Sequence, residues 1–374
     1  MHVLVTGSDG FIGKNLIIRL NEIGISISHF TRDSAIDELP YLIEKSNFII
    51  HLAGENRPID EKKFDIVNFG LTDTICKLIR SVGKTTPIIF TSSSQIKFDN
   101  AYGRSKLKAE TSLKNLEIDT GNPVFIYRLP GVFGKFCKPN YNSVVATFCH
   151  NISRNLPIAV NNPSSIINLV YVDDVVNDFV SVIKYNGNLK KNRSIQPEYE
   201  ITLDELANQL RCFWNSRDTL ISERVGNGLI RKLYSTFVSY IPPEKFSYPL
   251  AAHCDDRGMF AEMLKTQDSG QFSFFTAKPG VLRGGHYHHT KTEKFLVVSG
   301  NAKFQFRNII SNESYEIFIS SKELKVVETV PGWAHSITNI GKDEMVVMLW
   351  ANEIFDTDNP DTFSYEIEAK ANIV

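Results

Sequence analysis

The sequence predicts an α/β domain with a doubly wound parallel sheet, followed by an all-β jelly roll. A glycine-rich turn follows the first apolar run, and strand patterns then alternate with helical patterns, which is typical of a parallel sheet. From Phe246 onward, short β-type runs recur with a spacing of roughly ten residues, and Gly, Pro and Asn stand at the breaks. A chain of 374 residues has room for both domains.

The N-terminal turn has the composition of a dinucleotide-binding site. MHVLVT reads as a short buried strand, and an amphipathic run that ends near Ile23 follows the turn. Gly7, Gly10 and Gly13 permit a tight turn, a close approach of the backbone to a pyrophosphate, and packing of the helix on the strand. We therefore expect a Rossmann-type domain that binds a dinucleotide.

The end of the second strand bears on which dinucleotide binds. The predicted strands are Val3–Thr6, Ile25–Phe30, Phe48–Leu52, Ile88–Thr91 and Val124–Tyr127. An NAD-selective site would place an acid after the second strand, whereas this chain has Thr31 and Arg32 there. These side chains suit a 2′-phosphate, so the sequence favours NADPH. The alternative is that Arg32 is a solvated loop residue.

A serine cluster precedes a tyrosine and a lysine in TSSSQIKFDNAYGRSK, Thr91 to Lys106. If one helix carries Tyr102 and Lys106, their side chains lie one turn apart on the same face. The ammonium would then lower the pKa of the phenol, and a serine hydroxyl would hold a carbonyl oxygen while hydride arrives. This is the chemistry of ketone reduction, although a Tyr-x-x-x-Lys pair by itself is also common on helix surfaces.

Composition excludes several other classes. A net charge of −1 gives no support for nucleic-acid or membrane-surface binding. The five cysteines show no C-x-x-C spacing, which argues against a disulfide framework or a zinc knot. No run approaches the ~18 apolar residues of a membrane span, and the N-terminus reads as a strand and not as a signal peptide. We therefore expect a cytoplasmic protein with no membrane insertion.

The domain boundary is expected near Ile241-Pro242-Pro243-Glu244, which gives domains of residues 1–243 and 244–374. Before it, Thr202-Leu203-Asp204-Glu205 has the pattern of a capped helix start. After it, the predicted strands are Gln271–Thr276, Lys294–Val298, Ala302–Arg307, Ser314–Ile319, Leu324–Val327, Ser336–Asn339 and Glu344–Ala351.

Histidines gather in this second domain. His286 and His288 would share one face of a strand, and Glu293 can return across the hairpin toward them. His335 lies in a second turn, PGWAHSITN. Three imidazoles and a carboxylate suit a divalent transition metal such as zinc, with a coordination position left open. A lone histidine would more often be an ordinary core or surface residue.

The N-terminal motifs together resemble the extended short-chain dehydrogenase/reductase family that acts on nucleotide sugars. They are TGSDGFIG, HLAG (His51 to Gly54), Asn68, the serine cluster, Tyr102 with Lys106, YRLPGVFG and YVDDV. The resemblance implies that Tyr102 is the general acid, Lys106 its partner and ribose contact, and Ser94 the donor to the substrate carbonyl. Only eight positions separate Ser94 from Tyr102, so the choice among Ser92, Ser93 and Ser94 stays open. The implied cofactor contacts are Gly7, Gly10, Phe11, Ile12, Gly13, Thr31, Arg32, Leu52, Ala53, Gly54, Asn68, Tyr102 and Lys106.

YVDDV also carries Asp173 and Asp174, which we interpret as caps at the start of a helix and not as catalytic residues.

The C-terminal motifs, G-x5-H-x-H-x4-E-x6-G and PG-x-x-H-x3-N, resemble the two cupin motifs. DRGMF, GVLRG and EKFL also resemble sugar-nucleotide 3,5-epimerases, in which the LRG-x-H histidine is a general base and no metal is needed. His286 therefore has two incompatible assignments, metal ligand or base. Lys294 is a candidate to stabilise an enolate, or else a solvated charge on a strand.

The two halves together resemble the bifunctional capsular polysaccharide enzymes of the UDP-N-acetyl-L-fucosamine pathway. The resemblance implies cupin-catalysed epimerisation at carbon 3 of a UDP-2-acetamido-2,6-dideoxy-4-hexulose. NADPH-dependent reduction at carbon 4 would follow and give UDP-2-acetamido-2,6-dideoxy-β-L-talose. It also implies zinc and a homodimer. Two alternatives stay open: a reductase whose cupin only binds sugar or dimerises, and an NAD-dependent epimerase that retains its cofactor.

Overall fold

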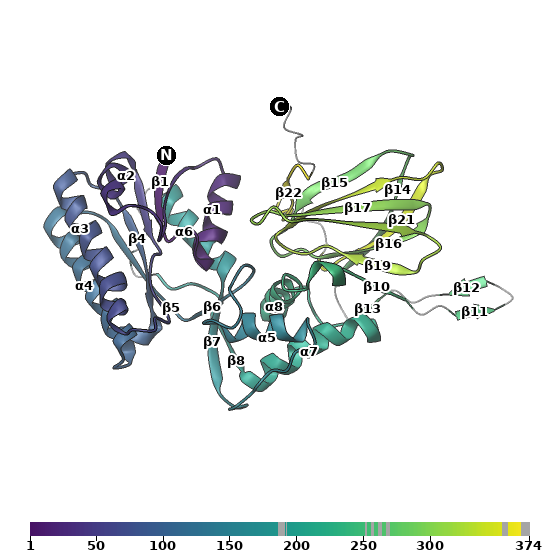
Figure 1. The fold of residues 1–374 in the computed structure, drawn as a ribbon, viewed down its shortest axis with the longest axis horizontal. Coiled ribbons are helices and arrows are strands. Elements are labelled where there is room, and N and C mark those ends of the chain that lie inside the picture. The colour runs from purple at the N-terminus through teal and green to yellow at the C-terminus, as the bar shows by residue number, and fades with distance from the viewer. Residues whose placement is uncertain are drawn as a thin grey trace. The chain divides into compact units, whose positions relative to one another are not determined.

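The computed structural model describes residues 1–185, 191, 193–250, 253–255, 258–260, 264–266, 270–353 and 358–367 (Figure 1). The chain divides into two compact units. The N-terminal unit comprises Met1–Val144 and Ile166–Ile201, and the C-terminal unit comprises Val145–Ser165 and Thr202–Val374. Residues 202–243 thus pack with the C-terminal unit, although their sequence pattern assigns them to the first domain. The boundary at residue 243 marks the change of pattern, and as a functional boundary it remains a prediction.

The N-terminal unit contains a five-stranded parallel sheet with the strand order β2-β1-β3-β4-β5. Its strands are β1 (His2–Thr6), β2 (Ser26–Phe30), β3 (Phe48–His51), β4 (Ile88–Ser93) and β5 (Val124–Leu129). All five predicted strands are present, and their parallel pairing confirms the Rossmann-type fold. Because the strands run in one direction, the loops after β1, β2, β3 and β4 leave the sheet at the same edge, where dinucleotides bind in such folds.

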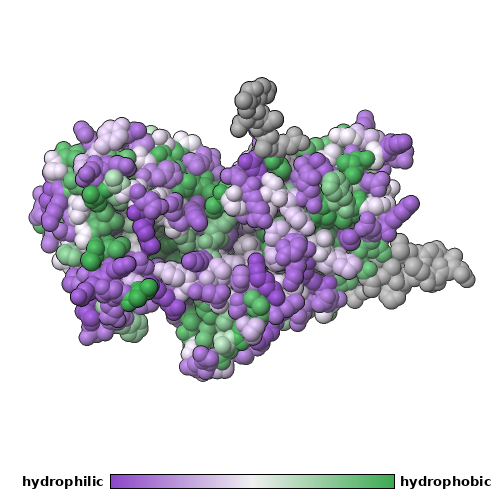
Figure 2. All heavy atoms as spheres, in the orientation of Figure 1, coloured by the Kyte–Doolittle hydropathy of each residue, from purple (hydrophilic) through white to green (hydrophobic). Residues whose placement is uncertain are grey.

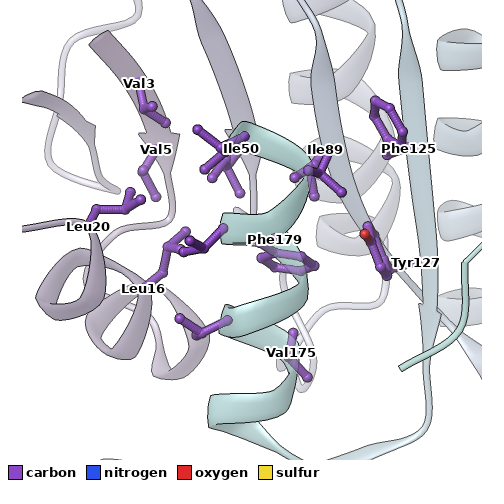
Figure 3. Close-up of a cluster of buried hydrophobic side chains, with 14 of the residues drawn as sticks. Val3, Val5, Leu16, Leu20, Ile50, Ile89, Phe125, Tyr127, Val175 and Phe179 are labelled. Carbon is purple, nitrogen blue, oxygen red and sulfur yellow. The ribbon is translucent and has the colours of Figure 1, made fainter. Parts of the chain in front are cut away.

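Helices cover both faces of this sheet (Figure 1). The first layer is α1 (Phe11–Glu22) and α6 (Val172–Lys184); the second is α2 (Leu39–Lys45), α3 (Leu71–Val82) and α4 (Ala101–Thr120). Alternate residues of β1 point to opposite layers: Val5 belongs to the same buried cluster as Leu16 and Phe179 (Figure 3), whereas Leu4 belongs to the other. Fully burying one such side chain contributes about 1.5–3 kcal/mol, so both apolar faces hold the sheet in register.

Shorter elements complete the N-terminal unit. They are η1 (Ile36–Glu38), the π-helix η2 (Phe64–Gly70), η3 (Ser94–Lys97) and a small sheet of β6 (Gly131–Phe133), β7 (Ile166–Tyr171) and β8 (Tyr199–Thr202). The prediction that Asp173 and Asp174 cap a helix is wrong in detail. Both lie in the first turn of α6, the capping position is Tyr171, and the carboxylate of Asp173 accepts hydrogen bonds from Lys135 Nζ at 2.8 and 2.9 Å. Acidic residues in a first turn still suit the helix dipole.

The C-terminal unit contains two five-stranded antiparallel sheets, with the orders β10-β19-β16-β21-β14 and β18-β17-β20-β15-β22. The first consists of β10 (Ser247–Pro249), β19 (Lys325–Glu328), β16 (Glu293–Ser299), β21 (Met345–Ala351) and β14 (Gln271–Ala277). The second consists of β18 (Ser314–Ser320), β17 (Asn301–Asn308), β20 (Trp333–Asn339), β15 (Leu282–Tyr287) and β22 (Phe363–Ser364). Every strand predicted after residue 246 is present, so the cupin jelly roll is confirmed.

Helices of the same unit precede the jelly roll: α5 (Val144–Ile152), α7 (Leu203–Thr219) and α8 (Gly228–Val238). The predicted helix start at Thr202 is a capping box, in which the Thr202 hydroxyl accepts from Glu205 N at 3.2 Å and Glu205 Oε2 accepts from Thr202 N at 2.9 Å. The remaining elements are η4 (Pro243–Lys245), β9 (Ile221–Ser222), β11 (His253–Asp255), β12 (Gly258–Phe260) and β13 (Lys265–Thr266).

The visible surface is mostly hydrophilic, and its apolar side chains form patches between polar ones, as on ordinary globular proteins (Figure 2). Within the described part of the chain, no helix has both the length and the apolar character to cross a membrane. No disulfide joins the four cysteines whose side chains are described, Cys76, Cys137, Cys149 and Cys212.

Candidate functional site

The turn after β1 forms the cradle expected for a dinucleotide. Gly7 has a φ of +67°, and a Cβ there would lie 2.7 Å from Ala53 N. A Cβ on Gly13 would lie 2.3 Å from Gly7 O, so the close approach of turn and helix requires glycine at both positions. Phe11 and Ile12 open α1, whose N-terminus has no side-chain cap. Its first backbone N–H groups are therefore available for an anion.

The loop after β3 brings a second part of the predicted cofactor site close to Lys106. A Cβ on Gly54 would lie 3.0 Å from Asn68 Oδ1 and 3.1 Å from Lys106 Nζ. Asn68 is buried, accepts a hydrogen bond from Glu55 N at 2.8 Å, and donates one to Ser105 Oγ at 3.0 Å. The Leu52–Gly54 backbone, Asn68 and Lys106 are thus held together by the fold, as the motifs predict.

Arg32 extends into solvent from the loop after β2. Its side chain is 83% exposed and lies 3.1 Å from Glu55 Oε2. An exposed ion pair of this kind contributes only about 0–1 kcal/mol, so little holds the guanidinium in this place. Thr31 N donates to Ser34 Oγ at 3.0 Å, which shapes the loop. A 2′-phosphate role for Thr31 and Arg32 remains a prediction.

Tyr102 and Lys106 lie one turn apart on α4, which Asn100 caps by accepting from Gly103 N at 2.7 Å. Lys106 is buried, donates to Thr91 O at 3.0 Å, and has a pKa that burial lowers to about 8. Burial raises the pKa of Tyr102, and a hydrogen bond with the Ser93 hydroxyl partly offsets that rise. The expected lowering of the phenol pKa by Lys106 is therefore not found: burial dominates the shift, and the hydrogen bond that offsets it comes from Ser93.

The three serines have different surroundings. Ser93 ends β4, hydrogen bonds with Tyr102 and accepts from Gln95 N at 3.2 Å. Ser92 points elsewhere and donates to Glu110 Oε1 at 2.7 Å. Ser94 begins the 3-10 helix η3, beyond the strand. The geometry thus places Ser93 beside the tyrosine. The role of Ser94, the serine chosen from the sequence, remains a prediction.

His286, His288, Glu293 and His335, named here the His/Glu cluster, come together in the jelly roll. One possible ligand atom from each lies within 4.8 Å of every other. His286 lies on β15, His288 directly follows that strand, Glu293 begins β16, and His335 lies on β20. Strand pairing brings His286 opposite His335, so the two predicted motifs converge on one site. The four predicted metal ligands are therefore one group capable of holding an ion.

The arrangement of hydrogen-bond donors and acceptors in this cluster is suitable for binding a cation. His288 Nδ1 lies 2.7 Å from the backbone oxygen of Asp361, which can only accept, so Nδ1 carries the proton; when the ring is neutral, Nε2 carries a lone pair. That Nε2 lies 3.2 Å from Glu293 Oε2, another acceptor. His335 Nε2 lies 3.3 Å from the same oxygen. Two ligands bound at about 2.0–2.1 Å in tetrahedral geometry are about 3.3 Å apart, so these separations suit a metal.

Two further observations agree with a metal. Both ring nitrogens of His335 are buried and make no well-aligned hydrogen bond to the described residues, although Nε2 lies 3.3 Å from Glu293 Oε2. Burial and the neighbouring histidines lower the pKa of His286 to about 3, and burial also lowers the pKa of His335. Both imidazoles are therefore neutral at pH 7, the form that binds metals. Burial alone would raise the pKa of Glu293, but His288 and His335 hold it well below the usual range.

A cavity of about 160 Å³ opens at the cluster. Its lining combines ring and aliphatic side chains with a few polar groups: Phe275, Arg283, Gly284, His286, Glu293, Phe295, His335, Ile337 and Leu349. The Arg283 guanidinium lies 5.0 Å from the centre of the Phe275 ring and donates to Thr276 O at 3.1 Å. Arg283 was missed as a functional candidate, although the LRG-x-H motif contains it.

Lys294 does not belong to this group. Its ammonium pairs with Glu328 and lies 3.2 Å from Tyr248 Oη. Glu328 also pairs with Arg217 of α7, and all three charged side chains are buried. Because side chains alternate along a strand, Lys294 and Glu293 face opposite sides of the sheet. The predicted enolate-stabilising role of Lys294 therefore has no geometric support.

Comparisons with known proteins identify the family to which the chain belongs. A model described as the NAD dependent epimerase/dehydratase family matches residues 3–196, and one described as a polysaccharide biosynthesis C-terminal domain matches residues 253–363. The chain is 55% identical over 370 residues to UDP-2-acetamido-2,6-beta-L-arabino-hexul-4-ose reductase from Pseudomonas aeruginosa, covering 98% of this chain and 99% of the relative. The chain belongs to the NAD dependent epimerase/dehydratase family.

A solved structure resembles the chain over both of its units. The capsular polysaccharide assembling protein CapF from Staphylococcus aureus is 41% identical with a TM-score of 0.68, covering 98% of this chain and 100% of that chain. A second relative, the spore coat polysaccharide biosynthesis protein SpsL from Bacillus subtilis, is 23% identical over 122 residues, which is 30% of this chain and 81% of the relative. The family fold of the N-terminal unit therefore occurs here joined to a cupin.

Proposed function

We propose that this chain is a bifunctional nucleotide-sugar enzyme. The cupin would epimerise carbon 3 of a UDP-2-acetamido-2,6-dideoxy-4-hexulose, and the N-terminal unit would reduce the 4-ketone with NADPH. The product would be UDP-2-acetamido-2,6-dideoxy-L-talose for capsule or O-antigen polysaccharide. The observation that carries the reduction is the full-length likeness to the P. aeruginosa hexul-4-ose reductase, together with Tyr102, Ser93 and Lys106 at the dinucleotide cradle. The epimerisation rests on the His/Glu cluster.

The reduction uses groups that the fold already orients. The reduced nicotinamide supplies hydride to carbon 4 and leaves oxidised. The Tyr102 hydroxyl gives its proton to oxygen 4, and Ser93 donates a hydrogen bond to the same oxygen as it gains charge. The raised pKa keeps the Tyr102 phenol protonated at neutral pH, as a general acid requires. Lys106 Nζ, close to Gly54, would hold the ribose.

Cofactor binding would use the residues assembled around the carboxyl ends of the strands. Those residues are Gly7, Gly10, Phe11, Ile12, Gly13, Thr31, Arg32, Leu52, Ala53, Gly54 and Asn68. Arg32 would pair with the 2′-phosphate of NADPH, for which its exposed guanidinium is available once it leaves Glu55.

Epimerisation would take place at the His/Glu cluster with a bound divalent ion, which we propose to be zinc. The metal would supply positive charge for the enolate oxygen at carbon 4. A base removes the proton from carbon 3, the electron pair moves to oxygen 4, and a proton then returns to carbon 3 from the opposite face. The 160 Å³ cavity is smaller than a typical ligand pocket of about 300–1,000 Å³, so it would admit only the reacting end of the sugar.

His286 has two roles open to it, and one experiment separates them. As a fourth ligand it would complete the donor set; as the base it would leave three ligands, which is still a common catalytic arrangement. Neutral imidazole serves either role. His286→Gln should lose metal if the residue is a ligand, and should keep metal while losing exchange at carbon 3 if it is the base.

The direct test of the reductase half is NADPH oxidation with the UDP-4-hexulose as the only acceptor. Oxidation matched by product formation supports the proposal. No oxidation, with tightly bound NAD in the purified protein, would instead favour an epimerase that retains its cofactor. We also propose a homodimer, which light scattering of the full chain would test.

A second candidate function follows from the P. aeruginosa relative, whose name mentions reduction alone. In that case the cupin would be a sugar-binding or dimerising module with no chemistry. Reduction would then occur without any proton exchange at carbon 3.

A further inference from the structure

We propose that Asp361 is a positioning residue for the His/Glu cluster, acting through His288 and the turn that follows it. The inference rests on the metal function proposed above. Asp361 belongs to a short C-terminal segment, residues 358–367, far along the chain from the cluster. No sequence motif marks it, since it lies 73 positions after His288 in a polar stretch.

The first contact is from the backbone of Asp361 to the His288 ring. His288 Nδ1 donates to Asp361 O at 2.7 Å. This bond fixes the neutral ring as the Nδ1-protonated tautomer and directs the Nε2 lone pair at Glu293 Oε2, 3.2 Å away. Histidines that bind metals commonly donate their second ring N–H to a carbonyl in this way, and losing that partner weakens binding.

The side chain of Asp361 holds the backbone that carries the ligand. Its carboxylate accepts from three successive N–H groups: His289 N at 2.9 Å, and Thr290 N and Lys291 N at 2.7 Å each. The Thr290 hydroxyl adds a fourth bond at 2.9 Å. Three consecutive N–H groups around one anion form a concave binding site, so this turn is shaped around the carboxylate.

The segment that carries Asp361 is itself anchored on both sides. Lys291 Nζ donates to Thr362 Oγ1 at 2.7 Å and to Pro360 O at 3.2 Å. The next residues form β22, which pairs with β15 and brings Phe363 opposite Tyr287, with ring centres 5.5 Å apart. Asp361 has a φ of +36°, in the left-handed region, so tertiary contacts and not local preference hold this backbone.

The contacts of Asp361 bear on the positions of His288 and Glu293, and not only on packing. The turn between β15 and β16 carries His288 at its start and leads to Glu293, and the Asp361 carboxylate binds the residues between them. A shift of the turn would move the two ligand atoms relative to each other, and metal affinity depends strongly on such positions.

The experiment measures zinc affinity of the full chain by competition with a chromophoric chelator. Asp361→Ala and Asp361→Asn should weaken zinc binding roughly 10–100-fold, the range found for residues that orient metal ligands. Asp343→Asn is the matched control, because Asp343 is an exposed acid in the loop between β20 and β21 of the same jelly roll. It should bind zinc as the unaltered protein does.

A second measurement separates orientation from a general loss of folding. In the metal-free protein, ¹⁵N chemical shifts of the His288 ring should report the Nδ1-protonated tautomer, and Asp361→Asn should give a mixture of tautomers. If Asp361→Ala does not fold, the tautomer and the zinc affinity of Asp361→Asn test the proposal by themselves. An unchanged tautomer together with unchanged zinc affinity in Asp361→Asn overturns the proposal.

His288→Ala distinguishes this failure from a failure of the metal function. If His288→Ala loses zinc while Asp361→Asn binds it normally, Asp361 has no positioning role and the metal site stands. If His288→Ala binds zinc as tightly as the unaltered protein, the metal function itself is wrong, and the inference about Asp361 fails with it.

Discussion

Glu293 and Lys294 are neighbours in β16, yet their side chains belong to different sites. The Glu293 carboxylate lies 3.2 Å from His288 Nε2, whereas the Lys294 ammonium pairs with Glu328 across the strands. One residue therefore serves the His/Glu cluster, and the next serves a buried ion network with Arg217 of α7. Because side chains alternate along the strand, Glu293 belongs to the His/Glu cluster and Lys294 to the ion network.

Replacing Lys294 should therefore destabilise the C-terminal unit without removing its metal. Lys294→Met leaves Glu328 buried with one partner fewer, and breaking a buried pair typically costs about 3–5 kcal/mol. Tryptophan fluorescence during urea unfolding would report the change, because Trp214, Trp333 and Trp350 all lie in this unit. Lys303→Met is the control, since the pair of Lys303 with Glu316 is partly exposed at 3.5 Å and should cost less than about 1 kcal/mol. If Lys294→Met kept normal stability but lost proton exchange at carbon 3, the result would support a catalytic role for Lys294.

Ser93 and Ser94 should differ in their effect on reduction. Ser93→Ala removes the hydroxyl that hydrogen bonds with Tyr102, so kcat for NADPH oxidation should fall by roughly 10²–10³-fold. Ser94→Ala, one residue further along, should stay within a few-fold of the unaltered enzyme. The opposite order of effects would show that substrate binding rearranges η3 and that Ser94 is the donor.

Arg32 should determine the preference between the two nicotinamide dinucleotides. Arg32→Ala should raise the KM for NADPH by roughly tenfold and leave that for NADH almost unchanged, because only NADPH carries the 2′-phosphate. The ratio of kcat/KM for the two cofactors is the quantity to compare. Arg80 of α3 is partly exposed and pairs with Asp119 of α4, so Arg80→Ala provides the control variant. An unchanged ratio in Arg32→Ala would mean that Arg32 is only a solvated loop residue.

His51 should make the N-terminal unit sensitive to acid. Burial, and secondarily the charge of Lys106, lowers the pKa of His51 to about 3, and its ring nitrogens lie 2.6 Å from Thr6 Oγ1 and 2.9 Å from Thr72 Oγ1. Between about pH 6.5 and 3 the unfolded chain binds a proton that the folded chain does not, so stability falls as pH falls through this window. A pKa difference of about 3.5 units corresponds to about 5 kcal/mol at most.

Hydrogen exchange of β1 and β3 amides, corrected for the intrinsic effect of pH, would measure this loss. The same experiment on His51→Gln provides the control, because glutamine does not titrate in this range and the slope with pH should become shallower. An equally steep slope in the variant would assign the acid sensitivity to other groups.

Much of the fold could be predicted because the signals are local. The glycine turn at Gly7 to Gly13, the strand alternation and the capping box at Thr202 each occupy a few adjacent residues, and the structure confirms all three. The members of the His/Glu cluster were also predictable, but the path of Glu293 was not: it was expected to return across a hairpin, whereas β15 and β16 belong to different sheets. What local pattern could not supply was the exact end of an element and its contacts: β4 ends at Ser93, and the Ser93 hydroxyl hydrogen bonds with Tyr102.

Other parts of the site depend on contacts between distant segments. Asp361 and His288 meet only because β22 pairs with β15, and neither composition nor spacing indicates this pairing. The side to which Lys294 points could have been inferred from its neighbour Glu293 by alternation. Its partner Glu328 also pairs with Arg217, which lies on a helix that sequence pattern assigns to the other domain. Burial, which raises the pKa of Tyr102 against the effect expected from Lys106, is likewise a property of the folded chain.

We propose that one chain carries two catalytic sites that act on the same ketone. The most direct test is mass spectrometry of the product formed from the UDP-2-acetamido-2,6-dideoxy-4-hexulose with NADPH in deuterated water, using the unaltered enzyme and Tyr102→Phe. The account predicts a product reduced at carbon 4 with one deuterium at carbon 3, and for Tyr102→Phe deuterium at carbon 3 without reduction. Reduction with no carbon-bound deuterium, or loss of both activities in Tyr102→Phe, would contradict it.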